Sequence, residues 1–216
     1  MLLVLHALIL CFIVVLLALN IIQHFFGYDY GEHPLPFLAI LLTGIVVAYH
    51  LVNAGPYLFT SFGIFIAVCG IGVFVTSEDI RGRYLPWSMY FGYESLPVGF
   101  RPLLQPTRVT ATVKIVDVFF QDLVLLGVAT YLLSVHSVSV AGLVCALVVF
   151  ALHLPGGYFY GRVYGLLFLV SASIAAFFVP LILSTVPYGF YLIFVFHLLM
   201  YPSIMVGAIP LRIFYR

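Results

Sequence analysis

The first 26 residues are MLLVLHALILCFIVVLLALNIIQHFF, a stretch that contains no Asp, Glu, Lys or Arg. A helix needs about 20 apolar residues to cross the hydrocarbon core of a bilayer, and this stretch is long enough to do so. It also lacks the basic segment that opens a cleaved signal peptide. We therefore expect residues 1–26 to be retained as a membrane-spanning helix.

The rest of the chain has the same apolar character. Of its 216 residues, 65% are hydrophobic and 7% are charged. A soluble domain carries about a quarter charged residues, so the expected solvent here is the lipid bilayer. The net charge is +1 and no basic run occurs, which predicts no nucleic-acid partner. Cys11, Cys69 and Cys145 lie inside apolar stretches without CxxC spacing, as is typical of small apolar side chains.

We predict an all-α fold, a polytopic bundle of about seven transmembrane helices that forms a single integral membrane domain over residues 1–216. Residues 1–76 hold three spans, 77–111 a cytoplasmic interfacial loop, and 112–216 four spans. The predicted spans are 1–26, 36–53, 56–76, 112–134, 137–154, 162–184 and 187–208. The predicted turns between them include Gly31 to Pro36, Asn53 to Pro56, Pro155-Gly156-Gly157 and Thr185-Val186-Pro187.

The basic residues predict the orientation of the chain, because cytoplasmic loops carry an excess of Lys and Arg. With seven spans, all 8 Lys and Arg residues fall on one side of the membrane. They lie in or beside the loop 77–111, as Lys114 does, at the start of the sixth span and at the chain end. We therefore expect the N-terminus outside and the C-terminus in the cytoplasm.

A few polar residues lie inside the predicted spans, where an ionisable group costs at least about 2.5 kcal/mol and is a functional candidate. They are Asp117, Gln121 and Asp122 in one span, with His153 and His197 in two others. Asp117 and Gln121 are four residues apart and share a helical face. A cluster of these groups in the cytoplasmic half could bind a divalent metal ion or activate a water molecule. The alternative is that each histidine hydrogen-bonds a neighbouring helix.

The remaining histidines are expected to have structural roles. His6, His24 and His50 lie in predicted spans and would hydrogen-bond neighbouring helices. His33 and His136 are predicted to be loop residues.

Four segments follow one another in the C-terminal half. They are Val116-Asp117-Val118-Phe119-Phe120-Gln121, Phe150-Ala151-Leu152-His153, the small-residue stretch from Gly165 to Pro180, and His197-Leu198-Leu199-Met200-Tyr201. Their order resembles the CAAX protease and bacteriocin-processing (CPBP) family of intramembrane proteases. In that family a Glu-Glu-x-x-x-Arg helix precedes a helix with a Phe-rich end and a His, a small-residue helix, and a helix with His-x-x-x-Asn.

The resemblance implies hydrolysis of membrane-anchored peptides or proteins. Asp117 would be the general base and Gln121 would orient it, while His153 and His197 would bind the water, or a divalent metal ion together with Asp117, and stabilise the oxyanion. This chain departs from the motif, with Val116 and Asp117 at the Glu positions, Gln121 at the Arg position and Tyr201 at the Asn position. Asp117 therefore lacks the family's ion-pair partner. The sequence predicts a divergent or degenerate member, active as a peptidase or able only to bind peptides.

Two other classes of function remain open. One is a non-catalytic subunit or scaffold of a larger membrane complex, because the chain has no soluble domain and few charges inside the spans. The other is a transporter or a haem-binding protein. Haem needs two histidines at similar depth, whereas His153 and His197 differ in predicted depth, and no repeated pair of Gly/Pro-broken helices favours transport.

Overall fold

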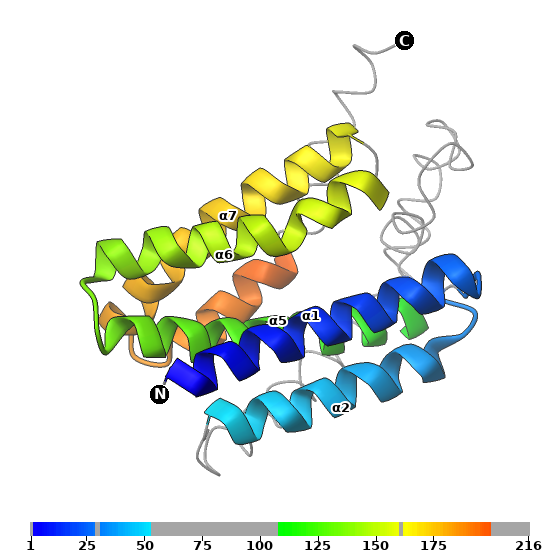
Figure 1. Cartoon of the computed structure of the whole chain (residues 1–216), viewed down its shortest axis with the longest axis horizontal. Helices are drawn as coiled ribbons and strands as arrows, with labels where there is room; N and C mark the ends of the chain where they lie inside the picture. The colour runs from blue at the N-terminus through cyan, green and yellow to red at the C-terminus, as the bar shows by residue number, and fades with distance from the viewer. Residues whose placement is uncertain (1, 29–30, 53–107, 160–161, 200–216) are drawn as a thin grey trace. The chain divides into compact units, whose positions relative to one another are not determined.

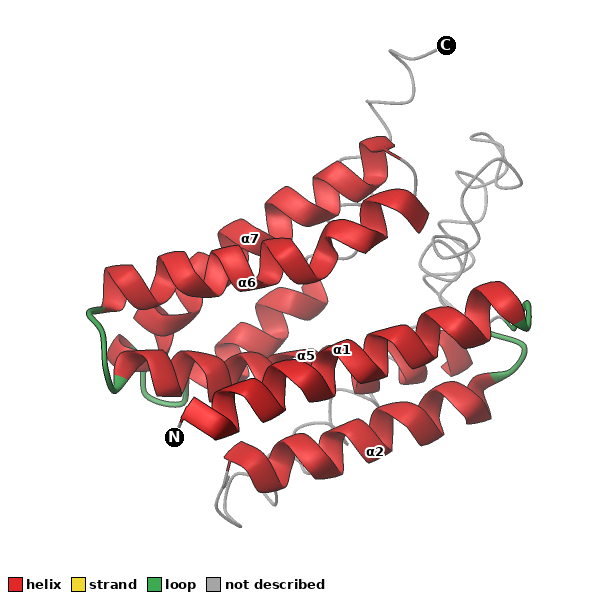
Figure 2. Cartoon of the chain, viewed as in Figure 1, coloured by secondary structure: helices red, strands yellow, loops and turns green. Residues whose placement is uncertain are grey.

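The computed structural model describes residues 2–28, 31–52, 108–159 and 162–199. These residues form six α-helices and no strand, which confirms the all-helical fold (Figures 1 and 2). The helices are α1 (Leu2–Phe25), α2 (Pro34–Val52), α5 (Arg108–Leu133), α6 (Val138–Phe159), α7 (Arg162–Thr185) and a final helix, Gly189–Leu199. The predicted span 56–76, the predicted turn from Asn53 to Pro56 and most of the loop 77–111 lie outside the described residues.

Three of the described helices are long and apolar enough to cross a membrane. Their apolar segments are Leu3–Gln23, Pro34–Val52 and Val109–Leu133, with 21, 19 and 25 residues. Three further apolar segments are shorter: Val138–Leu154, Leu169–Thr185 and Gly189–Leu199. A crossing needs about 20 residues, so the described part of the chain contains helices of the kind that make up a membrane protein.

Two helix boundaries differ from the prediction by about one turn or more. α5 begins at Arg108, about one turn before the predicted start, so residues 108–111 belong to a helix and not to the loop. α6 continues to Phe159, so the turn predicted at Pro155-Gly156-Gly157 is wrong. An unpaired backbone group costs several kcal/mol in an apolar medium, which favours a helix that continues through Pro and Gly. The predicted break after Thr185 is confirmed, since α7 ends there.

The chain divides into two compact units, of which one covers Leu2–Val124. In this unit α1 and α2 pack side by side, and the first part of α5 joins them. The rings of Phe12 and Phe120 stack with their centroids 5.8 Å apart. A Cβ at Gly44 would lie 2.8 Å from the side chains of both Phe120 and Val15. The missing side chain of Gly44 therefore leaves the room that the Phe120 ring occupies.

The other unit contains the residues from Leu125 onward. Here α6 and α7 pack along each other (Figure 1). A Cβ at Gly142 of α6 would lie only 2.5 Å from the backbone carbonyl oxygen of Phe177 in α7. Both helices also bury small side chains, namely Ala141 and Cys145 on α6 and Ala172 and Ala176 on α7. Close approach of the two backbones therefore depends on Gly142.

The outer surfaces of the helices are apolar. Large side chains such as Leu10 and Leu17 of α1 and Leu147 of α6 are 60%, 57% and 59% exposed. Polar side chains bond to carbonyls of their own helix instead, as Asn20 Nδ2 does to Leu16 O at 2.8 Å and Ser173 Oγ to Leu169 O at 2.7 Å. An apolar exterior with internally satisfied polar groups suits contact with lipid.

Replacing Gly142 with Ala should lower stability, although Ala is intrinsically the better helix former by about 1 kcal/mol. The new methyl group meets a backbone oxygen, which cannot rotate away, so α6 and α7 must separate. The same change at Gly44 should cost less, because its neighbours are side chains that can shift. Thermal unfolding of both variants in lipid nanodiscs checks this, with exposed Ser139→Ala on α6 as the control. A Gly142→Ala variant as stable as the wild type would contradict the close contact.

Candidate functional site

α5 carries four of the five Asp, Glu, Lys and Arg residues that lie inside the described helices. Its sequence, RVTATVKIVDVFFQDLVLLGVATYLL, interrupts an apolar pattern with Lys114, Asp117, Gln121 and Asp122. At 1.5 Å per residue the 26-residue helix is about 39 Å long, longer than the roughly 30 Å hydrocarbon core. Asp117 lies about 14 Å and Asp122 about 21 Å from its first residue. The earlier start of α5 thus places both carboxyl groups further from the first residue of the helix than the sequence suggested.

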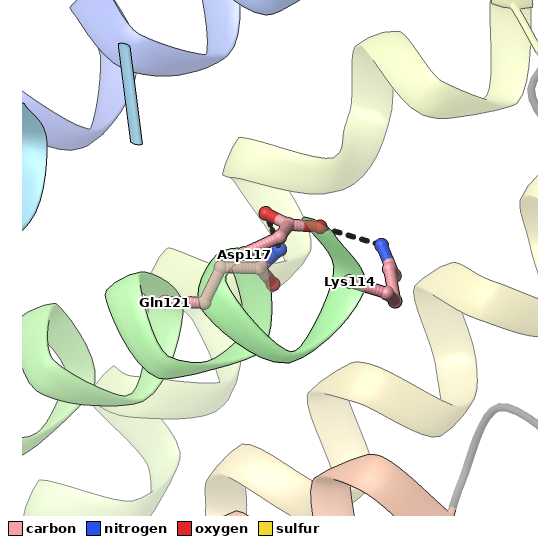
Figure 3. A network of polar contacts seen from close by, with 3 residues as sticks. All are labelled: Lys114, Asp117 and Gln121. Atoms are coloured by element: carbon pink, nitrogen blue, oxygen red, sulfur yellow. Dashed lines mark hydrogen bonds and ion pairs between the residues drawn. The ribbon is translucent and has the colours of Figure 1, made fainter. Parts of the chain in front are cut away.

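Asp117 is the centre of a network of side chains on this one helix (Figure 3). Lys114 Nζ donates to Asp117 Oδ2 at 2.5 Å, and Gln121 Nε2 donates to Asp117 Oδ1 at 2.8 Å. Spacings of three and four residues bring side chains together on a helix surface. The contact expected between Gln121 and Asp117 is therefore present. The Lys114 and Asp117 side chains are 22% and 14% exposed, so the ion pair is largely enclosed.

Lys114 is the residue that the sequence analysis missed. Lys114 falls inside the predicted span 112–134 but is counted with the basic residues beside the loop 77–111, and the sequence leaves Asp117 without an ion-pair partner. The structure corrects this second point, because Lys114 binds the Asp117 carboxylate from one turn earlier in α5. The three-residue spacing between the two was the available signal. Lys114 is also the single lysine of the chain.

Asp122 belongs to a different face of α5. It follows Gln121 by one residue, which turns it about 100° around the helix. Its side chain is 2% exposed and it is the one charged residue among the buried side chains of the described part. Asp122 thus occupies the interior, while Asp117 lies in the bonded network with Lys114 and Gln121.

The candidate histidines lie in the other unit. His153 of α6 is half-buried, and its Nδ1 lies 2.8 Å from the carbonyl oxygen of Val149. A carbonyl only accepts, so Nδ1 carries the proton, and in a neutral ring Nε2 is the nitrogen that can accept or bind a metal ion. His197 is half-buried in the helix Gly189–Leu199.

The side chains of His6, His33, His50 and His136 are exposed. His33 and His136 are confirmed as loop residues. The His33 ring contacts Tyr28, with centroids 4.5 Å apart, and the exposed His50 ring contacts Tyr49 at 5.6 Å.

The structure thus brings together Asp117 and Gln121 from the predicted set and adds Lys114. Asp117 and Asp122 belong to the unit Leu2–Val124, and His153 and His197 to the other, so their convergence stays a prediction from the sequence. Tyr201 lies outside the described residues. Among the described residues, no group of three His, Cys, Asp or Glu side chains could hold a metal ion. A divalent metal ion also stays a prediction.

Comparison with known proteins adds no relative, since no family model, no curated protein and no solved structure matches the chain.

Replacing Lys114 with Met should lower the free energy of unfolding by about 2 kcal/mol, because the Asp117 carboxyl group then loses its cationic hydrogen-bond donor in largely enclosed surroundings. The double variant Lys114→Met/Asp117→Leu should regain most of that loss, since it removes both charges. Thermal unfolding in nanodiscs, followed by circular dichroism, measures the difference. Equal stability of the single variant and the wild type would show that the pair contributes nothing.

Proposed function

We propose that this chain is a multi-pass integral membrane protein that hydrolyses membrane-associated peptides, with Asp117 of α5 as the general base. The observation that carries the proposal is the network around Asp117, in which Lys114 and Gln121 each donate to one carboxylate oxygen. A charged group inside an apolar helix is costly and is by default a candidate for function. We infer the peptide substrate from the order of segments in the C-terminal half, which resembles the CPBP family.

The network leaves Asp117 chemically competent. A carboxylate offers about four acceptor positions, of which Lys114 and Gln121 use two. One that remains can accept a proton from a water molecule while the water oxygen attacks the scissile carbonyl carbon. When the C–N bond breaks, the protonated Asp117 returns that proton to the leaving amine. Lys114 and Gln121 hold the carboxylate in one orientation for both transfers.

The proposal includes a seven-span topology with the N-terminus outside and the C-terminus in the cytoplasm. α6 and α7, with 22 and 24 residues, have the length of full crossings. At a rise of 1.5 Å per residue they measure about 33 and 36 Å. The asymmetry of Lys and Arg in the sequence supports the orientation.

Purified protein in nanodiscs, supplied with membrane-anchored peptides, tests the proposed hydrolysis. Asp117→Asn should lower turnover by about 100-fold or more, because loss of a general base costs that much. Ser173→Ala is the matched control, since its hydroxyl bonds within α7, and should leave turnover unchanged. His153→Ala and His197→Ala test the roles expected from the sequence. No cleavage by the wild type, or equal cleavage by Asp117→Asn, would overturn the proposal.

A second candidate is a non-catalytic subunit of a membrane complex. The observation that favours it is that the candidate catalytic side chains make hydrogen bonds within their own helices. Asp117 does so in α5 and His153 in α6. Exposed apolar faces on α1 and α6 would then contact partner helices as well as lipid. Purification from membranes in a mild detergent separates the two candidates. A stoichiometric partner in the absence of peptide cleavage would favour the subunit.

A further inference from the structure

The turn between α7 and the final helix holds a tyrosine in a backbone conformation that favours glycine. Gly189 N donates to Val186 O at 3.0 Å, which closes a β-turn with Pro187 and Tyr188 at its centre. Tyr188 has a φ of 59°, and the ring of Pro187 fixes a negative φ at the position before it. This combination is that of a type II turn, in which Gly or Asn is the usual residue at the Tyr188 position. A residue with a Cβ costs free energy there.

Packing within the described part of the protein does not explain this cost. Tyr188 is 82% exposed, and its ring lies beside the ring of Tyr191 with the centroids 6.3 Å apart. Phe190, between these two tyrosines, is 4% exposed and belongs to the core. An unusual backbone conformation at a residue that the core does not hold is grounds for inferring a role for its side chain outside the chain.

The position of the turn along α7 indicates what the ring contacts. α7 has 24 residues and is about 36 Å long, slightly more than the roughly 30 Å of the hydrocarbon core. A crossing helix that begins at one interface with the charged Arg162 therefore ends at the opposite interface, at Thr185. The apolar exterior continues to the turn, since Leu181 and Val186 are 45% and 37% exposed. A crossing by α7 thus brings Tyr188 to the level of the lipid headgroups.

We propose that Tyr188 anchors this turn in the headgroup region of the bilayer. A tyrosine ring suits that layer, because its apolar body can contact acyl chains while its hydroxyl group hydrogen-bonds to lipid oxygens or to water. The free energy gained from the lipid offsets the backbone strain of the turn. The anchor holds the end of α7 and the start of the final helix at a fixed depth. It shares the membrane crossing of α7 with the proposed function and does not depend on peptide hydrolysis.

Fluorescence of a single tryptophan in lipid bilayers measures the depth of this side chain. Trp87 is the one tryptophan of the chain, so Trp87→Phe provides the background for Tyr188→Trp. Bromine atoms on lipid tails quench a nearby tryptophan. Tyr188→Trp should be quenched about two-fold or more strongly by bromines near the headgroups than by bromines near the chain ends. The control is Ile174→Trp, at a site on α7 that is 57% exposed and about 17 Å before Thr185, and it should show the reverse order.

A second pair of variants separates the ring from the backbone strain. Tyr188→Ala keeps the Cβ and the strain but removes the ring, so it should lower the unfolding temperature in nanodiscs by about 2 °C or more. Tyr188→Trp should keep the unfolding temperature of the wild type, because it keeps an interfacial ring.

Quenching of Tyr188→Trp by iodide in the water, and not by brominated lipid, would overturn the anchor. Shielding from both quenchers would also overturn it and would indicate that the ring contacts protein, such as a second copy of the chain. Equal stability of Tyr188→Ala and the wild type would contradict a gain of free energy from the ring. Lipid quenching of Ile174→Trp alone would overturn the anchor and leave the crossing of α7, whereas quenching of neither variant would overturn both.

Discussion

Lys114 Nζ lies 2.5 Å from Asp117 Oδ2 on a helix whose other residues are mostly apolar, and the account of this protein depends on that ion pair. Inside a bilayer a charge must be neutralised and hydrogen-bonded, or the helix that carries it inserts poorly. Lys114 and Gln121 meet both needs for Asp117 from within α5. The same constraint explains why Asn20, Ser173 and His153 bond to backbone carbonyls of their own helices.

Packing in the unit Leu2–Val124 determines which face of α5 holds this pair. Phe120 precedes Gln121 directly and lies about 100° away from it around the helix. Its ring stacks on Phe12 and occupies the space left by Gly44. These contacts fix the rotation of α5 against α1 and α2. The apolar contact and the polar face are therefore two results of one helix orientation.

The helices could be predicted from the sequence because apolar length is a property of each segment alone. The contact between Asp117 and Gln121 was predictable for the same reason, since spacing along one helix determines it. Two local errors concerned the ends of helices. Pro155 to Gly157 lie within α6, and α5 begins at Arg108, before the predicted start at residue 112.

The predicted convergence of Asp117 with His153 and His197 could not be checked from spacing along one helix. It depends on which faces of separate helices meet, and these polar residues, with Gln121, are too few to define those faces. Neither composition nor spacing determines the rotation of one apolar helix against another, because lipid and protein neighbours are almost equally apolar. The sequence therefore identified the candidate groups without determining their arrangement.

Solid-state NMR on protein in bilayers measures the central interaction directly. Lys114 is the single lysine, so ¹⁵N-lysine labelling produces one side-chain amine signal. With ¹³C-aspartate present, the account predicts a strong dipolar coupling between Lys114 Nζ and an aspartate carboxyl carbon, and its loss in Asp117→Leu. An absent coupling in the wild type, or one that persists in Asp117→Leu, would contradict the ion pair.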